Sequence, residues 1–303
     1  MTLRLGWWNS GLQGRTAPTQ HELDAASRVI RALRAEVGCD LVAVCEVRPT
    51  YAEALVQRVV VDSNTSAVTD QPSPAIEHNF ALFFNPARVM PATDRVVQSY
   101  YARHRACAGL VYSLAVPRSK TLISLAMCHW PAQGMGDVDH ADTMRQASAQ
   151  ALRAALTEGD QFRDCLLLGD FNAEPFDGPL VAMGGTRDIE QVRLHPDLLY
   201  NLAWRWLGSM PPYAGRVPMD RAGTYRLASG RGSRWRTFDQ ALVSANFLRG
   251  EGWSLREGES SPRHIGALRG PRGAYLATQF DHLPLVVTLE YISPHAEGSD
   301  LDG

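Results

Sequence analysis

The sequence predicts a layered α/β protein, in which helices cover β-sheets. Short apolar runs rich in β-branched and aromatic residues indicate buried strands, and amphipathic segments with helical spacing alternate with them. The 303 residues are 45% hydrophobic and 20% charged, which is typical of a globular protein and unlike a disordered, collagen-like or coiled-coil chain. A domain of this length buries about three quarters of its unfolded surface. We therefore expect one domain over residues 1–292 and a polar, acidic tail at 293–303.

The expected strands are short and apolar. Residues 1–9 enter a strand pattern at once, with Leu3, Leu5, Trp7 and Trp8 among them. Further runs have the composition of buried strands: Asp40–Cys45, Phe80–Phe84, Leu110–Val116, Thr121–Cys128, Cys165–Leu168, Gln240–Val243 and Leu285–Leu289.

Two helices are expected between these strands. Residues 19–22 read Thr-Gln-His-Glu, a capping box that begins a helix. Apolar side chains then recur on one face as far as Val37, and Gly38 is the residue type that ends helices. The second helix is expected from about Asp142 to Leu156, ending near Gly159.

Cysteine usage and charge exclude several classes of protein. An odd number of cysteines, mostly inside apolar runs, indicates buried thiols in a reducing compartment: Cys39, Cys45, Cys107, Cys128 and Cys165. No apolar run approaches the ~18–20 residues needed to cross a bilayer, and residues 1–9 lack the features of a signal peptide. We therefore expect a cytoplasmic protein with no membrane insertion. The net charge of −2 excludes a uniformly basic nucleic-acid coat but leaves room for a local basic groove.

Polar residues that suit metal and phosphate chemistry follow or begin the expected strands. They occur in the segments Trp8-Asn9-Ser10, Cys45-Glu46-Val47, Cys128-His129-Trp130, Gly169-Asp170-Phe171-Asn172, Phe238-Asp239-Gln240 and Phe280-Asp281-His282. Strand ends in layered α/β proteins share a rim, where ligands commonly bind. One such residue alone is usually a solvated turn or a core histidine. Their repetition along one chain predicts a common site.

These residues, in this order, resemble the endonuclease/exonuclease/phosphatase superfamily, which has the deoxyribonuclease I-like fold. The resemblance spans roughly residues 3–290, and its specific part is Gly169-Asp170-Phe171-Asn172 with Asp281-His282 downstream. The run Gly223-Thr224-Tyr225, followed by Trp235 and Asp239-Gln240, also looks like bacterial members. The resemblance implies a four-layer α/β sandwich, with two mixed sheets face to face and helices outside.

The chemistry of these residue types agrees with phosphodiester hydrolysis. Oxygen ligands suit Mg²⁺ or Mn²⁺, and such a cation acts on phosphate as a Lewis acid. The resemblance implies that Glu46 is the main metal ligand, with Asn9 assisting, and Asp281 offers a further carboxylate. There is no cysteine/histidine cluster with the spacing of a structural zinc site.

The resemblance also implies catalytic roles. Asp170 would orient or deprotonate the attacking water, and Asn172 would hold the phosphate or that water. His282, oriented by Asp239, would contact the scissile phosphate, and His129 would stabilise the phosphate or protonate the leaving group. Purely structural alternatives exist, because Asn9 and Asp239 are residue types that cap turns, and His129 is a candidate for a packed core histidine.

Arginine-rich loops predict a nucleic-acid substrate, with DNA favoured over RNA. Arginine clamps phosphates and aromatic side chains stack on bases, although any one such loop can equally be solvated surface. The expected substrate-binding residues are Arg103, Arg105, Arg231, Arg234, Trp235 and Arg269.

We thus expect a metal-dependent nuclease. The alternatives are a phosphatase acting on inositol phosphates, lipid head groups or other small phosphoesters, and a non-catalytic nucleic-acid-binding module on the same fold. A regulatory protein partner that spares the host is a hypothesis, and the sequence does not identify one.

Overall fold

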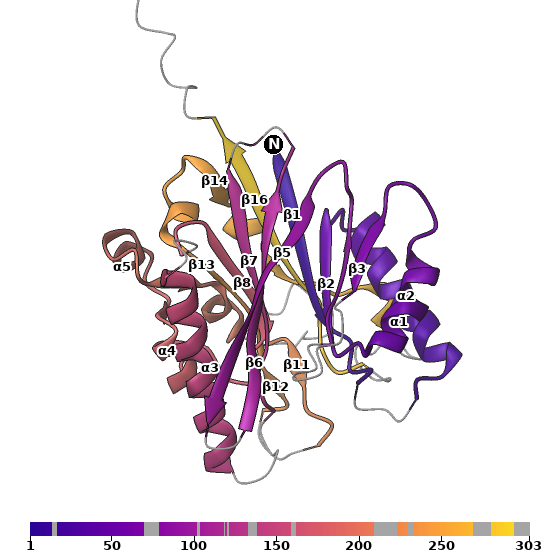
Figure 1. The fold of residues 1–303 in the computed structure, drawn as a ribbon, viewed down its shortest axis with the longest axis horizontal. Coiled ribbons are helices and arrows are strands. Elements are labelled where there is room, and N and C mark those ends of the chain that lie inside the picture. The colour runs from indigo at the N-terminus through magenta and orange to yellow at the C-terminus, as the bar shows by residue number, and fades with distance from the viewer. Residues whose placement is uncertain are drawn as a thin grey trace, which may run out of the picture.

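The structure is a computed structural model that describes residues 1–13, 17–69, 79–101, 104–117, 119, 121–132, 138–158, 162–208, 223–229, 233–268 and 280–293. Its framework consists of two large β-sheets (Figure 1). The expected tail at 293–303 falls almost entirely outside the described residues. The single-domain assignment stays a prediction.

Both sheets are mixed. The first has the strand order β14-β16-β1-β2-β4-β3, with β15 also paired to β16; its strands are β1 (Thr2–Asn9), β2 (Leu41–Cys45), β3 (Ser66–Thr69), β4 (Ala81–Phe84), β14 (Gly252–Leu255), β15 (Ser261–Pro262) and β16 (Leu285–Ile292). The second has the order β5-β6-β7-β8-β13-β10-β9; its strands are β5 (Met90–Tyr101), β6 (His104–Ala115), β7 (Leu122–His129), β8 (Cys165–Asp170), β9 (Gly185–Thr186), β10 (Leu199–Asn201) and β13 (Asp239–Val243). A separate ribbon pairs β11 (Tyr225–Arg226) with β12 (Trp235–Arg236).

Helices cover the outer faces of the paired sheets (Figure 1). Helices α1 (Gln20–Ala35) and α2 (Pro49–Val59) lie against the first sheet, and α3 (Val138–Glu158) and α4 (Gly178–Ala182) lie against the second. Shorter elements are α5 (Ile189–Leu194), η1 (Leu202–Trp206), η2 (Ala245–Leu248), η3 (Glu257–Glu259) and η4 (Gly266–Leu268). This arrangement confirms the predicted four-layer α/β sandwich.

Alternation of side chains along each strand builds three core layers. In β1, Leu3, Leu5 and Trp7 point between the two sheets, whereas Trp8 packs with the layer under α1. In β2, Leu41 and Ala43 face the sheet interface, whereas Val42 and Val44 face the helices. Strands buried on both faces are continuous apolar runs, which is why these strands are predictable from sequence.

The pairing pattern brings the predicted polar residues to one edge. Strands β1 and β2 are parallel, and so are β7 and β8, so Asn9, Glu46, His129 and Asp170 all lie at or just past the carboxyl ends of their strands. Strand β13 is antiparallel to β8, with Asp239 directly opposite Asp170. Strand β16 is antiparallel to β1, so the segment that precedes it reaches the same edge.

Most of the expected elements are present. The capping box is formed, since the Glu22 amide donates to Thr19 Oγ1 at 3.2 Å and the Thr19 amide donates to Glu22 Oε2 at 2.7 Å. Helix α3 begins four residues earlier than expected, at Val138 rather than Asp142. Helix α2 and the edge strand β5 were not among the expected elements, and neither were the shorter elements β3, β9, β10, β14, α4 and α5. Cys39, Cys45, Cys128 and Cys165 are buried thiols as expected, and Cys107 is partly buried. Among the described helices, none combines the length and the apolar composition that crossing a bilayer requires.

Candidate active site

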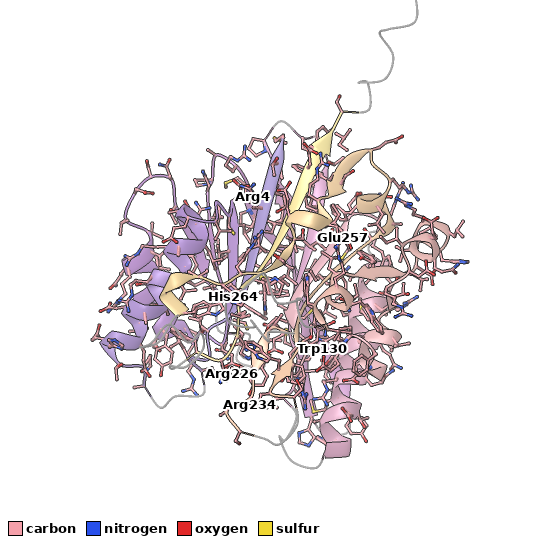
Figure 2. The ribbon with its side chains drawn as sticks, turned by 180° about the vertical axis from the view of Figure 1, so that it is seen from behind. Arg4, Trp130, Arg226, Arg234, Glu257 and His264 are labelled. Carbon is pink, nitrogen blue, oxygen red and sulfur yellow. The ribbon has the colours of Figure 1, made fainter. Side chains whose placement is uncertain are left out.

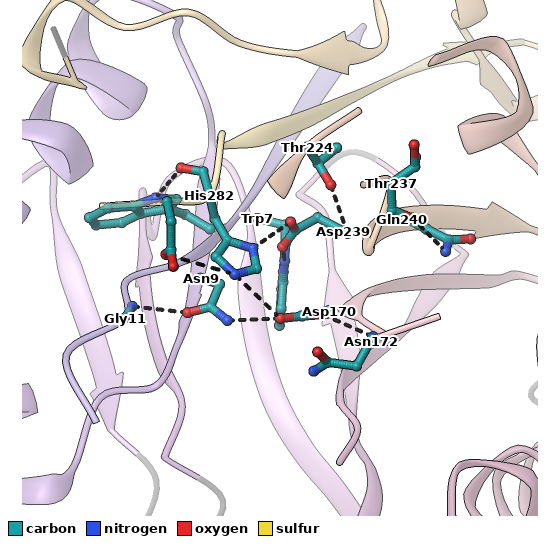
Figure 3. A network of polar contacts seen from close by, with 12 residues as sticks. Trp7, Asn9, Gly11, Asp170, Asn172, Thr224, Thr237, Asp239, Gln240 and His282 are labelled. Atoms are coloured by element: carbon teal, nitrogen blue, oxygen red, sulfur yellow. Dashed lines mark hydrogen bonds and ion pairs between the residues drawn. The ribbon is translucent and has the colours of Figure 1, made fainter. Parts of the chain in front are cut away.

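Asn9 connects the two carboxylates at the centre of the site. It lies at the end of β1 and is 1% exposed. Its side-chain amide donates to Glu46 Oε1 at 3.0 Å and to Asp170 Oδ2 at 2.9 Å, and its Oδ1 accepts the Gly11 amide at 2.9 Å. Figure 3 shows this amide between Gly11 and Asp170. Asn9 is therefore a donor that holds carboxylates from both sheets together, and metal ligation through its oxygen stays a prediction.

Glu46 and His129 form an ion pair across the sheet interface. His129 Nε2 lies 3.3 Å from Glu46 Oε1. Burial alone would raise the pKa of Glu46, but the hydrogen bond and charge of His129, with the Asn9 amide, lower that pKa to about 2. Burial alone would lower the pKa of His129, whereas Glu46 and Asp170 raise it above its usual value. The pairing therefore favours the charged forms of both groups, a carboxylate beside an imidazolium.

Asp170 is held by the turn that follows β8. Its Oδ1 accepts the Asn172 amide at 2.9 Å, and Asn172 Nδ2 donates to the Trp130 carbonyl at 2.9 Å. Asn172 has a φ of 48°, a left-handed conformation that asparagine tolerates better than most residues. Burial, joined by the charge of Asp239, raises the pKa of Asp170 despite the opposing effect of His282. A carboxylate with a raised pKa is a stronger base than a surface aspartate.

His282 lies between two buried aspartates. Its Nδ1 is 2.7 Å from Asp239 Oδ2, and its Nε2 is 3.7 Å from Asp170 Oδ2 (Figure 3). Asp239 also accepts the Trp7 indole N–H at 2.9 Å. Burial alone would lower the pKa of His282, but the charge and hydrogen bond of Asp239, with the charge of Asp170, raise it to about 10. His282 is therefore a cation directed at Asp170.

Asp281 is the exposed member of the group. Its side chain is 52% exposed, and its Oδ1 lies 4.0 Å from His282 Nε2. Burial raises its pKa, and His282 partly offsets that effect. A Cβ atom at Gly11 would lie 3.7 Å from Asp281 Oδ1, so the loop after β1 passes close to this carboxylate. Asp281 thus lies at the solvent side of the site.

The donor groups fit a divalent cation. One ligand atom from each of Glu46, His129 and Asp170 lies within 4.8 Å of the others, and the same holds for Asp170, Asp239 and His282. The first group fits better, because Glu46 and His129 are partly exposed and within reach of an entering cation, whereas Asp170, Asp239 and His282 are all buried. Carboxylate oxygens are preferred ligands of Mg²⁺ and Mn²⁺. The coarse prediction of a site able to hold a divalent metal therefore fits the geometry.

Sequence reasoning assigned no site role to three residues that support this group. The Trp7 indole binds Asp239 from the sheet interface, and Thr224 Oγ1 accepts the Asp239 amide at 2.9 Å. The Tyr225 ring stacks on Phe238 at 5.4 Å and contacts the His282 ring at 4.6 Å. The run Gly223-Thr224-Tyr225 carried a family signal, whereas a buried tryptophan in a strand looks like ordinary core.

Two of the predicted substrate-binding residues belong to or adjoin the β11–β12 ribbon beside this centre: the Arg226 amide donates to the Asp281 carbonyl at 2.8 Å, and Arg226 pairs with Trp235. Arg234 donates to the carbonyl oxygens of Leu227 at 3.1 Å and Ala228 at 2.7 Å, within its own loop. Trp235 is half-buried against the core layer under α1. Figure 2 shows Arg226 and Arg234 in the same half of the molecule as Trp130, the residue after His129, with Arg4 and Glu257 in the other half. Arg105 is exposed on β6. The other predicted substrate-binding residues, Arg103, Arg231 and Arg269, lie outside the described residues.

The fold and this set of carboxylates and imidazoles define a protein built for phosphoester chemistry. A model of the Endonuclease/Exonuclease/phosphatase family matches residues 6–295, and the chain belongs to that family. Its members are metal-dependent hydrolases acting on phosphoesters. A comparison with curated proteins gave no match.

Solved structures share the fold at low sequence identity. D. rerio TDP2 in complex with a single-strand DNA product is 17% identical with a TM-score of 0.58, covering 95% of this chain and 99% of that one. The human Nocturnin catalytic domain with bound sulfate is 18% identical with a TM-score of 0.57, covering 96% and 94%. A family protein from Bacteroides thetaiotaomicron is 14% identical with a TM-score of 0.58, covering 95% of each chain. At these identities the likeness shows the fold alone.

Proposed function

We propose that this protein is a divalent-metal-dependent nuclease that hydrolyses phosphodiester bonds, with DNA favoured over RNA. The observation that carries the proposal is the Asn9 amide, which holds Glu46 from one sheet against Asp170 from the other, with His129 and His282 on either side. Two carboxylates between two imidazolium groups match the needs of an anionic phosphoryl transition state. The structure of D. rerio TDP2 with a single-strand DNA product supports a nucleic-acid substrate.

In this proposal each side chain has one task. A cation held by Glu46, with Asp170 or Asp281, would neutralise charge on the phosphate and act as a Lewis acid. Asp170 accepts a proton from the attacking water as the new P–O bond forms, its raised pKa suiting it to this role. Asn172 holds Asp170 through its backbone amide and orients the water or phosphate.

The two histidines act on the phosphate. His282, cationic beside Asp239, donates a hydrogen bond from Nε2 to a non-bridging oxygen. His129, cationic beside Glu46, gives its proton to the leaving oxygen as the old P–O bond breaks. The proton lost by water thus ends on Asp170 and the proton gained by the leaving group comes from His129, so the step balances.

A supercoiled-plasmid assay tests the proposal. The parent is incubated with Mg²⁺, Mn²⁺ or EDTA beside Asp170→Asn, which keeps the shape of the side chain and removes its charge. Asp197→Asn is the matched control, because Asp197 is 71% exposed and pairs with Arg153 on the surface. We expect metal-dependent nicking by the parent and the control, and none by Asp170→Asn.

Two results would contradict the proposal. Equal cleavage by Asp170→Asn and the parent would overturn the role of Asp170. A folded, metal-loaded parent that cuts neither DNA nor RNA, with or without ends, would exclude a nuclease. Release of inorganic phosphate from a panel of inositol phosphates and other small phosphoesters would then indicate the phosphatase alternative. Metal-tolerant binding of nucleic acid without turnover would indicate the non-catalytic module.

A further inference from the structure

The β5–β6 hairpin continues past the strand that carries His129. Leu110 of β6 pairs with Met127 of β7, and the Trp130 indole donates to the Ala108 carbonyl at 2.9 Å. From Ala108 the strand runs back to His104 without a β7 partner, which is about 13 Å of overhang at ~3.3 Å per residue. In Figure 1 the free end of the hairpin reaches the lower edge of the molecule, at the end where β11 and β12 lie. The hairpin end therefore lies beyond the end of β7 that carries His129.

One face of this overhang is packed against α3. Ser99 Oγ lies 2.9 Å from Ser148 Oγ of α3, in a buried contact. The His140 ring of α3 contacts the rings of Tyr101 at 5.3 Å and His104 at 4.5 Å. The buried Ser99–Ser148 contact therefore fixes this face of the hairpin to the helix.

The opposite face looks towards the other sheet and the site. Gln98 and Tyr100 alternate with Ser99 and Tyr101 along β5, and their partners across the hairpin are Cys107 and Arg105. An irregularity at Ala108 shifts the register, and beyond it Leu110 and the following alternate residues of β6 enter the core between the sheets. His129 points to this same side, because it contacts Glu46 of the first sheet. Tyr100 and Arg105 thus share the inner face with His129.

The chemistry of this inner face suits a nucleotide. The Tyr100 hydroxyl donates to Gln98 Oε1 at 2.7 Å, and Tyr100 is 62% exposed. The Arg105 guanidinium carbon lies 5.4 Å from the centre of the Tyr100 ring. An exposed aromatic ring beside a cation is the combination that binds single-stranded nucleic acid, since the ring stacks on a base and the cation meets a phosphate.

We propose that Tyr100 and Arg105 form a subsite for an unpaired nucleotide that flanks the scissile phosphodiester in single-stranded nucleic acid. The proposal rests on the proposed function for the position of the scissile bond. Tyr100 stacks on the base, with Gln98 holding the ring in place, and Arg105 binds a phosphate of the same strand. The overhang places this nucleotide beyond the bond that is cleaved, so the subsite acts on longer substrates and not on small diesters.

The test compares Tyr100→Ala and Arg105→Ala with the parent on two kinds of substrate. The substrates are bis(p-nitrophenyl) phosphate and single-stranded oligothymidylates of increasing length. Tyr101→Ala is the matched control, because it removes the same side chain from the next residue on the face that α3 covers. Thermal melting of each variant confirms folding.

We expect the ratio of kcat/KM for long oligonucleotides to that for the small diester to fall about tenfold in Tyr100→Ala, with Tyr101→Ala close to the parent. Arg105→Ala should flatten the dependence of log KM on log salt by about 0.7, as for one lost phosphate contact on a single strand. The two substitutions should reduce the cleavage of a blunt duplex of the same sequence by less. Equal length dependence in Tyr100→Ala and the parent, or an equal loss in Tyr101→Ala, would overturn the subsite.

A binding measurement tests the subsite independently of the proposed nuclease activity. Fluorescence anisotropy of a labelled oligothymidylate with Asp170→Asn reports affinity without cleavage. If the double variant Asp170→Asn/Tyr100→Ala binds more weakly than Asp170→Asn, the subsite is supported. This holds even if the parent cleaves no phosphodiester, because the absence of cleavage would overturn only the nuclease assignment. Unchanged affinity on adding Tyr100→Ala overturns the subsite, whatever the parent cleaves.

Discussion

His282 Nδ1 lies 2.7 Å from Asp239 Oδ2, and both side chains are buried at the sheet edge. The other oxygen of Asp239 accepts the Trp7 indole N–H at 2.9 Å. With both oxygens engaged, the carboxylate has one orientation and accepts a hydrogen bond from the Nδ1–H of His282. The imidazole therefore presents Nε2 towards Asp170, 3.7 Å away.

Asp239→Asn should release His282 from this arrangement. Loss of the carboxylate charge removes the main influence that raises the pKa of His282, so that pKa should fall towards its ordinary value. We expect kcat at neutral pH to fall by about 100-fold, within the usual contribution of an acid–base group. Steady-state kinetics with an NMR titration of His282 measures both effects.

Trp7→Phe is the milder comparison for Asp239→Asn, since it removes the indole hydrogen bond and keeps the carboxylate. It should reduce kcat by less than Asp239→Asn and leave the His282 pKa raised. An Asp239→Asn protein whose His282 still titrates near pH 10 would contradict this account of the pair.

The sequence predicted that these polar residues meet at one sheet edge, because the fold obeys simple strand rules. Asn9, Glu46, His129 and Asp170 follow continuous apolar strands, and parallel neighbours end at the same edge. The contacts among them were beyond sequence reasoning. That the Asn9 amide faces both carboxylates, and that Trp7 binds Asp239, depends on the separation of two sheets whose packing has no local signal.

Strand β5 and helix α2 were missed for different reasons. Strand β5 is at an edge of its sheet and exposes Met90, Val96 and Tyr100, so it lacks the apolar run of a strand buried on both faces. Helix α2 did carry a signal, with Pro49 in its first turn and buried residues at helical spacing from Ala52 onwards. The sequence could not show which side chains of the β5–β6 hairpin face α3, because the irregularity at Ala108 reverses the alternation of side chains between the two faces.

His282 should also make the stability of the metal-free protein depend on pH. Its folded pKa of about 10 exceeds the unfolded value of 6.5, so the folded chain binds one proton more between these values. The free energy of unfolding therefore contains a contribution that is complete below pH 6.5 and is lost as pH rises to about 10. The slope for one proton is about 1.4 kcal/mol per pH unit.

Urea unfolding in EDTA between pH 6.5 and 7.5 measures this slope, below the range in which most thiols of the unfolded chain ionise. His282→Gln should lose stability at pH 6.5 and show a smaller decline with pH than the parent. The remaining decline belongs to His129, whose pKa is also raised. Parallel pH profiles for the parent and His282→Gln would contradict a cationic His282 in the folded protein.

Gly169 is required by the close approach of β7 and β8. A Cβ atom at this position would lie 2.6 Å from both the Cβ and the carbonyl oxygen of Cys128. Gly169→Ala must therefore push the strands apart, and we expect a loss of about 1–3 kcal/mol in the free energy of unfolding. Activity should fall as well, since His129 and Asp170 are the next residues on these strands.

Gly178→Ala is the matched control for Gly169→Ala, because its added Cβ would meet only Gln146 Oε1, at 3.7 Å. Its urea midpoint should equal or exceed that of the parent. Equal midpoints for Gly169→Ala and the parent would show that the strands adjust to the extra carbon without cost.

Glu46 is expected to contribute to metal binding and, separately, to the metal-free fold. A ligand that binds only the folded state raises Tm with its concentration, so Mn²⁺ should raise the Tm of the parent, and Glu46→Gln should need at least about tenfold more Mn²⁺ for an equal rise.

Without metal, the lowered pKa of Glu46 stabilises the folded chain above pH 4.5, and that contribution is lost as pH falls towards 2. Glu46→Gln should therefore also melt lower than the parent at pH 7 in EDTA, whereas the exposed Glu53→Gln should match the parent in both titrations. A lower Tm in EDTA with an unchanged Mn²⁺ response would assign Glu46 to the ion pair with His129 and move the cation to Asp170 and Asp281.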